Sequence, residues 1–461
     1  MLPVMLTLAV GLAAVGAWAA DPIRVADPKD RVIVDGFLKQ AAKVPEEITP
    51  EYCKQMAEED AEGTEAYTWR IMPYLRMPLT AYQITRDPRH LEIFVQTFEN
   101  MRSALTTGPD GFLGWYGKAD PDYRDPNDPD RRVDAVISSF STAETVCTFL
   151  TLVAEDAALS RKYAKQRAEY LDLIENHLVR KHDARGDYVD LGGAGAIYRT
   201  PPVGLKPTSA RLTLPHNKHS IIIRGLLALY RVTGKDEYMQ KAIKLGTRFK
   251  HCLTLKDGHY EWNYWDPAGP WDINPQDPGG WKHWIGPEHR GGYYSSSLSQ
   301  AVLLYQHALV FGKEDIERFV RTQLEMCWNR DFDHPQWSRV DGTRPPEYTQ
   351  GEYISSALAP FSDKVAEYLF TGARQEERIR NSGESWEGGP VTNGWLRAKL
   401  IDYPAARRAR QPHLDLGKRF LASPGNQTFA ASLGFEVRPP GYAAPLSPAA
   451  MTPMPGEPER P

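Results

Sequence analysis

Apolar residues recur along most of the chain at every third or fourth position, which is the spacing of one face of an α-helix, whereas the alternation typical of strands is scarce. Three segments resemble one another in this pattern, at 79–90, 227–238 and 303–315. In each, an apolar helix ends near a tyrosine, a short polar or glycine turn follows, and a helix with charged outward positions begins. Gly234 and Gly312 are predicted to end the first helix, because glycine readily adopts the left-handed conformation of a helix C-cap. The pattern therefore predicts a chain of helix hairpins.

The more buried helices of these hairpins are predicted to begin near Tyr67, Val136, Lys218, Tyr294, Tyr353 and Val391. The steps between them leave room for one hairpin and one long loop each. Stacked hairpins cover the apolar faces of their neighbours. About six of them closed into a ring would give an all-α fold, an α/α toroid with the first helices inside and the second helices outside. An open helical solenoid is the alternative, but the long Trp- and Gly-rich loops favour a ring with an elaborated rim.

Both ends of the chain differ from this pattern. Residues 1–19 are apolar and end in Ala-Trp-Ala, a small-x-small cleavage pattern, so we predict a secretory signal peptide and a secreted or periplasmic protein. No later segment is apolar enough to predict a membrane span. The toroid is predicted to occupy residues 20–404. Residues 405–461 are predicted to form a C-terminal extension, with a few strands near 416–437 followed by a disordered Pro- and Ala-rich tail.

Composition adds constraints on function. A net charge of −4, without a basic block or a basic helix face, argues against a dedicated nucleic-acid-binding protein. The chain has 12 Trp and 22 Tyr, and aromatic rings are common both in carbohydrate clefts, where sugars stack on them, and in large cores. The four cysteines match no zinc motif, and either disulfides or buried free thiols fit their wide spacing. No Gly-rich cofactor motif occurs, so no cofactor is expected.

A polar cluster precedes each of the first five predicted buried helices, at 65–70, 131–134, 216–219, 288–294 and 347–353. In a toroid all inner helices begin on one rim, so these clusters would converge there. The His-Asn-Lys-His run at 216–219 places two imidazoles, an amide and an ammonium at the N-terminus of a helix. The helix dipole and the unpaired N–H groups at that position favour an anionic ligand.

An aromatic-rich stretch lies between the third and the fourth of these helices. At 258–266 four aromatic residues are interleaved with His, Glu, Asn and Asp, and the segment is predicted to be extended, on a cleft wall, with Glu261 in the polar interior. Trp271, Trp281 and Trp284 follow. This stretch suits a platform on which sugar rings stack. The alternative is a packed loop that is anchored by its own aromatic residues.

Three chemistries fit these residue types. Paired carboxylates could hydrolyse a glycosidic bond, with candidates Glu261, Glu288, Glu347 and Glu352. A metal site would draw on His216, His219, His283 and His289, but these histidines lack a recognised ligand spacing, so no metal site is predicted. A β-elimination on a uronic acid needs a group that neutralises the C6 carboxylate, a base for the C5 proton and an acid for the leaving oxygen. Those residue types are supplied by His216, Asn217, Arg290 and Tyr294.

The His-Asn-Lys-His run, the Glu-Trp-Asn segment at 261–263 and the Glu-His-Arg-Gly-Gly-Tyr-Tyr run at 288–294 together resemble the α/α-toroid polysaccharide lyases that cleave alginate or glucuronan, most of all polysaccharide lyase family 38. The resemblance covers roughly residues 60–400 and rests on the order and layout of these motifs. It implies a tyrosine as catalytic acid and base, either Tyr294 or Tyr293. It also implies that the charge of the uronate is neutralised by His216, Asn217 and Glu261, with Arg290 assisting.

We therefore predict an exported lyase that acts on an acidic polysaccharide, such as a polymer of glucuronate, mannuronate or guluronate. The residues predicted to bind this substrate are Glu288, His289, Arg290, Lys218, His219, Trp262, Trp284 and Trp69. His216 and Asn217 could instead only cap their helix. The alternatives are a glycoside hydrolase on the same scaffold, a uronosyl epimerase and a non-catalytic protein that binds acidic glycans.

Overall fold

The computed structural model describes residues 21–61, 64–118, 130–202, 205–344, 351–382, 386–407 and 411–433. The predicted signal peptide and the tail beyond residue 433 lie outside these ranges. Within them the chain is mostly helical, and the strands form only two-stranded antiparallel pairs. The predicted all-α class is confirmed.

Helices and helical turns follow one another along the chain. In the first half they are α1 (Pro28–Ala42), α2 (Val44–Glu47), α3 (Pro50–Glu59), the π-helical turn η1 (Tyr67–Ile71), α4 (Met72–Thr85), α5 (Arg89–Arg102), α6 (Val136–Ala154), α7 (Ala157–Lys162), α8 (Ala164–Asp172), η3 (Leu173–Val179) and α9 (Arg180–Ala184). In the second half they are α10 (His216–Thr233), α11 (Asp236–His251), α12 (Gly291–Gln306), α13 (Lys313–Arg321), η6 (Thr322–Cys327), η7 (Ser356–Phe361), α14 (Asp363–Phe370), α15 (Gly372–Asn381), α16 (Gly389–Leu396), η9 (Arg397–Asp402), α17 (Tyr403–Arg407), α18 (Gln411–Leu421) and α19 (Pro424–Ala431). The strands pair as β1 (Thr106–Thr107) with β2 (Leu113–Gly114), β3 (Gly117–Lys118) with β4 (Arg132–Val133), β5 (Tyr188–Asp190) with β6 (Ala196–Tyr198), β7 (Thr254–Lys256) with β8 (His259–Glu261), and β9 (Ile273–Asn274) with β10 (Asp277–Trp281).

The predicted beginnings of the buried helices agree with the structure. Two of them, η1 and α6, begin at Tyr67 and Val136 as predicted. The other four begin close to the predicted positions, at His216, Gly291, Ser356 and Gly389. Apolar periodicity locates these helices because a segment covered by neighbours on most sides is apolar over much of its circumference.

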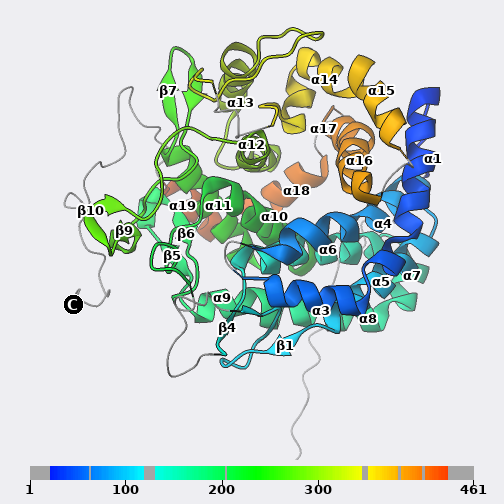
Figure 1. Ribbon diagram of the computed structural model, residues 1–461, viewed down its shortest axis with the longest axis horizontal. Helices are drawn as coiled ribbons and strands as arrows, with labels where there is room; N and C mark the ends of the chain where they lie inside the picture. The colour runs from blue at the N-terminus through cyan, green and yellow to red at the C-terminus, as the bar shows by residue number, and fades with distance from the viewer. Residues whose placement is uncertain are drawn as a thin grey trace, which may run out of the picture.

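The buried segments contact one another in the order of the sequence (Figure 1). Helix α4 contacts α6, α6 contacts α10, α10 contacts α12, and α12 contacts η7. The circuit continues from η7 to α17, η9 and α16, and α16 contacts α4 again. Most of these segments also contact a helix that follows them in sequence: α5 on α4, η3 and α8 on α6, α11 on α10, α13 on α12, and α14 on η7. The first and the last of the buried helices therefore meet.

Helices α6 and α10 pack backbone against backbone. A Cβ atom added at Gly225 of α10 would lie 2.6 Å from the carbonyl oxygen of Phe140 in α6, so a larger residue at this position would push the helices apart. By length and apolar composition alone α6 is long enough to cross a membrane, but 83% of its most apolar stretch is buried inside the protein. Within the described residues it is therefore a core helix of the fold.

The turns of two predicted hairpins differ from each other. Helix α10 ends at Gly234, whose φ of 70° is left-handed, as predicted. The prediction for Gly312 is wrong, because this residue is extended and forms the N-cap of α13, where its N–H donates to Asp315 Oδ2 (2.7 Å). Helix α12 ends several residues earlier, and the chain turns through Ala308 and Val310, which both have positive φ.

The C-terminal segment contradicts the prediction of strands near 416–437. In its described part it forms α18 and α19. Helix α18 packs across the ends of α10 and α12, where the Phe420 ring lies edge-on to Tyr230 (6.1 Å between centroids). The backbone at Gly417 is so close to the carbonyl oxygen of His307 that no Cβ atom would fit between them. These tertiary contacts stabilise helices in a segment whose local sequence has little preference.

The four cysteines, Cys53, Cys147, Cys252 and Cys327, all lie within the described ranges. Each is a buried thiol, and none forms a disulfide. Of the two alternatives for the cysteines, the structure therefore has buried free thiols.

Candidate active site

The first turns of the buried segments lie together at one end of the protein, which we call the rim. Hydrogen bonds and an ion pair join neighbouring segments there: Thr68 of η1 with Ser138 of α6 (3.1 Å), Glu65 before η1 with Lys218 of α10 (2.7 Å), and Ser295 of α12 with Ser355 before η7 (3.1 Å). The ion pair of Glu65 with Lys218 thus brings two of the predicted polar clusters together, those at 65–70 and 216–219.

The two adjacent tyrosines at the start of α12 have different environments. Tyr294 is fully buried, its hydroxyl donates to Gln323 Oε1 (2.9 Å), and burial raises its pKa well above the ordinary value. Tyr293 is half-buried, its ring stacks on Tyr264 (5.3 Å between centroids), and the guanidinium of the exposed Arg290 lies 5.5 Å from its centroid. Successive helical residues point about 100° apart, so one ring enters the core and the other faces the rim. Of the two candidates, only Tyr293 is within reach of a substrate.

His289 lies beside Tyr293. Its ring is edge-on to Tyr293 (5.3 Å) and to Tyr264 (4.5 Å). Burial, followed by the positive charge of Arg290, lowers the pKa of His289 to about 4. Its Nδ1 atom has no hydrogen-bond partner among the described residues. His289 is therefore a neutral imidazole at neutral pH, and its Nδ1 atom is buried.

Two exposed tryptophans flank this group. Trp69 and Trp284 each keep 46% of their surface exposed, which is unusual for such large apolar side chains. The Trp69 indole N–H donates to Glu65 Oε2 (2.8 Å), and Glu65 is ion-paired with Lys218 (2.7 Å). The guanidinium of Arg339 lies 6.0 Å from the Trp284 ring. The rim therefore presents flat aromatic surfaces next to fixed positive charges.

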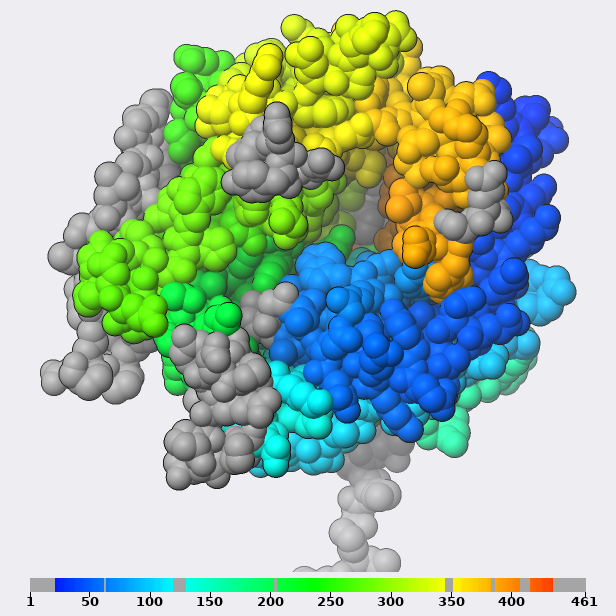
Figure 2. Space-filling view, in the orientation of Figure 1, coloured from blue at the N-terminus to red at the C-terminus, as the bar shows by residue number. Residues whose placement is uncertain are grey.

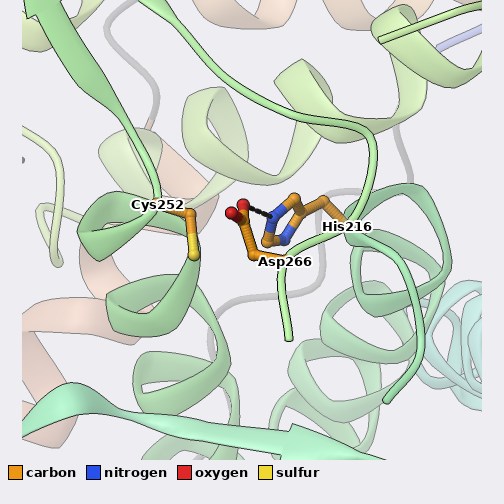
Figure 3. A group of neighbouring side chains, drawn as sticks. All are labelled: His216, Cys252 and Asp266. Carbon is orange, nitrogen blue, oxygen red and sulfur yellow. Dashed lines mark hydrogen bonds and ion pairs between the residues drawn. The ribbon is translucent and has the colours of Figure 1, made fainter. Parts of the chain in front are cut away.

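His216 lies beneath the rim, in the buried group that Figure 3 shows. Its Nε2 is 3.2 Å from Asp266 Oδ2, and the Cys252 thiol adjoins them. Burial alone would lower the pKa of His216, but the hydrogen bonds to Asp266 and Cys252 outweigh it and raise the pKa to about 9. His216 is therefore an imidazolium at neutral pH, held at the first residue of α10 but out of contact with solvent.

The same three side chains offer nitrogen, sulfur and oxygen atoms within 4.8 Å of one another, which are ligand types that zinc accepts. A structural zinc site uses four protein ligands, and this group supplies three. The hydrogen bonds of His216 already account for the arrangement, so its simplest role is to fix this imidazolium.

Glu288, Trp262 and Asn217 also lie behind the rim. Burial raises the pKa of Glu288 to about 8, although its carboxyl accepts a hydrogen bond from Ser297 (2.6 Å). The Trp262 ring stacks on Tyr294 (5.6 Å), and Asn217 is 1% exposed. None of the three is accessible to a polymer in this conformation. They support the residues that form the surface.

The structure does not bring His219 and Glu261 to the rim surface. His219 is buried, its Nε2 accepts the N–H of Tyr198 (3.0 Å), and burial lowers its pKa to about 3, which fits a structural role. Glu261 lies on β8 and is ion-paired with Lys256 (3.0 Å) of the paired strand β7. Because side chains alternate along a strand, the burial of its two aromatic neighbours turns Glu261 to the other side.

Three residues of the rim were not among the predicted site residues. Glu65 lies in one of the predicted polar clusters, and Tyr264 in the predicted aromatic stretch, so both carried a local signal in the sequence. Arg339 follows η6 in a segment without helical periodicity, and nothing in its local sequence indicates the rim.

Comparisons of the sequence with protein-family models and with curated proteins found no match.

Proposed function

We propose that the protein is an exported α/α-toroid enzyme that cleaves a uronic-acid-containing polysaccharide by β-elimination. The toroid is supported by the circuit of contacts from α4 through α6, α10, α12 and η7 to α16 and back to α4. The meeting of the first and last buried helices favours a ring over an open solenoid, whose ends do not touch.

The observation that carries the proposed reaction is the group around Tyr293. This phenol is within reach of solvent, next to a neutral imidazole at His289 and a guanidinium at Arg290. Exposed Trp69 and Trp284 supply surfaces on which sugar rings stack. β-Elimination on a bound uronate needs a surface on which the sugar stacks, a cation for its carboxylate, a base for its C5 proton and an acid for the leaving oxygen.

In the proposed reaction, Arg290 neutralises the C6 carboxylate, which makes the C5 proton more acidic. His289 removes that proton, and the electron pair forms the C4–C5 double bond. The C4–O bond then breaks as the Tyr293 hydroxyl gives its proton to the leaving oxygen. Transfer of the proton from His289 to the tyrosinate restores both groups.

The buried imidazolium of His216 supports the same end of the protein. It lies at the first residue of α10, two residues before Lys218, and its positive charge is held there by the pairing with Asp266. We assign it a positioning and electrostatic role, since its side chain is only 4% exposed.

The positions of the predicted carboxylates favour elimination over hydrolysis. Glu288 is buried, Glu261 is held on its own strand pair, and Glu352 is ion-paired with Arg374. Glu347 lies outside the described residues. Among the described candidates one glutamate is thus buried and the other two are held in ion pairs, which does not favour them as the acid and base of a glycoside hydrolase.

The adjacent tyrosines provide a matched test. Tyr293→Phe removes the proposed acid, and we expect it to lower the rate of unsaturated-uronate formation by about 100-fold or more, measured by ultraviolet absorbance on glucuronan and alginate. Tyr294→Phe loses a buried hydrogen bond to Gln323 and is the control, with a loss of stability but a near-normal rate in the folded fraction. Equal activity of Tyr293→Phe and wild type would exclude the proposed mechanism.

A further inference from the structure

A cavity of about 630 Å³ extends from the rim between the buried segments. Figure 2 shows the surface hollowed at the centre of this face, between α4 in blue and α16 in orange. Residues three or four apart on the same helix line the cavity, such as Pro73 and Arg76 on α4 and Arg224, Ala228 and Arg231 on α10. One face of each buried helix is therefore turned to a shared space, and its volume is in the range of small-molecule sites.

Positive charges outnumber negative ones where Arg76, Arg224 and Glu144 line this space. Arg76 Nη2 lies 2.9 Å and Arg224 Nε 3.6 Å from the same Oε2 atom of Glu144. The two arginine side chains remain 21% and 29% exposed, although they lie inside the protein. Two guanidinium groups thus share one carboxylate, and one positive charge is left over next to the cavity.

A third arginine, Arg397, is close enough to add to the repulsion between these charges. Burial, together with the positive charges of Arg224 and Arg397, lowers the pKa of Arg76 to about 10 against the attraction of Glu144. Arg397 is itself paired with Asp402 (3.4 Å). Holding like charges together inside a protein costs free energy, which a bound anion would offset.

The opposite wall of the cavity is neutral and rich in hydroxyl groups. Ser295, Ser296 and Ser299 of α12 line it together with Ser355 and Ser356 at the start of η7. Ser295 and Ser355 are linked to each other at 3.1 Å. A ligand that carries both a carboxylate and several hydroxyl groups would match the two walls.

We propose that this cavity is a binding subsite for one uronic-acid unit of the substrate, with its carboxylate at Arg224 and Arg76 and its hydroxyl groups toward the serines of α12 and η7. The inference rests on the proposed function, because it treats the cavity as a continuation of the sugar-binding rim. Gly292, next to Tyr293 in sequence, lines the cavity, so a chain held at the rim has a direct way into it.

Isothermal titration of the full-length protein with D-glucuronate, and with D-glucose as the neutral control, tests this subsite without any need for cleavage. We expect glucuronate but not glucose to bind to the wild type. Arg224→Gln removes the surplus charge and leaves Arg76 paired with Glu144, so it should fold and should weaken glucuronate binding by about tenfold or more. Ala228→Phe keeps all charges but fills the space, and it should weaken binding as well.

Arg102→Gln is the matched control. Arg102 lies on α5, is ion-paired with Glu99 (2.7 Å), and has a side chain as exposed as that of Arg224, at 27%. It should leave glucuronate affinity unchanged. Equal binding by Arg224→Gln, Ala228→Phe and wild type, all confirmed folded by thermal unfolding, would overturn the subsite. If glucuronate binds in the cavity but no polyuronate is cleaved, the proposed function fails and the subsite remains.

Discussion

The buried pair of His216 and Asp266 leads to a quantitative prediction about pH and stability. The pKa of His216 rises from 6.5 to about 9 on folding. A base with a raised pKa in the folded state stabilises the protein fully below its unfolded pKa, and this stabilisation is lost as the pH rises through its folded pKa. The relevant window is therefore pH 6.5 to 9. At 1.36 kcal/mol for each pKa unit, the raised pKa corresponds to about 3 kcal/mol of the free energy of unfolding at pH 6, shared between the contacts of His216 with Asp266 and with Cys252.

Asp266→Asn removes the charge and keeps the size of the side chain. Urea unfolding followed by tryptophan fluorescence, at intervals between pH 6 and pH 9.5, gives the free energy of unfolding of both proteins. The wild type should exceed the variant by about 1–3 kcal/mol at pH 6, because the contact of His216 with Cys252 remains, and the difference should shrink toward zero by pH 9.5. Glu288, with a pKa raised to about 8, titrates in the same range and is coupled to the charge of His216, so both proteins are compared in a Glu288→Gln background.

His216→Gln is the second variant of this test. It removes the titrating group itself, so its difference from the wild type should have the same dependence on pH. A constant difference over the whole range for both variants would refute the protonated state of His216 and, with it, the positive charge assigned to the start of α10.

Further predictions concern the rim and the core. Trp69→Ala and Trp284→Ala remove exposed stacking surfaces, so each should raise KM several-fold for a polyuronate while kcat and the melting temperature change little; an unchanged KM in both would remove the tryptophans from the binding surface. Gly225→Ala places a Cβ atom 2.6 Å from the Phe140 carbonyl oxygen and should cost about 1–3 kcal/mol by urea unfolding, whereas no loss would mean that α6 and α10 move apart freely. The pKa of His219 falls to about 3 on folding, so its stabilisation is present above pH 6.5 and is lost as the pH falls toward 3; His219→Gln should lessen this acid-side loss, and an unaltered acid profile would contradict the buried neutral state.

The buried helices could be predicted because their signal is local. The stretches from Val136 and from His216 are apolar over several turns, and they begin where the sequence pattern indicated. The C-terminal helices α18 and α19 could not be predicted from local sequence, because they are stabilised by packing against the ends of α10 and α12, which are distant in sequence. Gly312 begins α13 and does not end the helix before it, because its N–H donates to Asp315 of α13.

The candidate site was predictable as a set of segments but not residue by residue. Tyr293 and Tyr294 are equivalent in the sequence, and only the orientation of α12 decides which ring enters the core. The position of Glu261 was indicated by its neighbours. Tyr260 and Trp262 are both aromatic and buried, and in an extended segment they lie on the face opposite to Glu261, which therefore points away from the core. Arg339 could be found only from the fold.

The central claim is β-elimination at the rim, and the ratio of two products measures it most directly. Glucuronan, alginate, pectate and glycosaminoglycans would each be incubated with the protein, and unsaturated uronate and new reducing ends would be quantified in the same samples. We predict that at least one of these polymers yields one unsaturated end for each new reducing end, and that Tyr293→Phe suppresses both. Reducing ends without unsaturated uronate would show hydrolysis and contradict the proposed reaction.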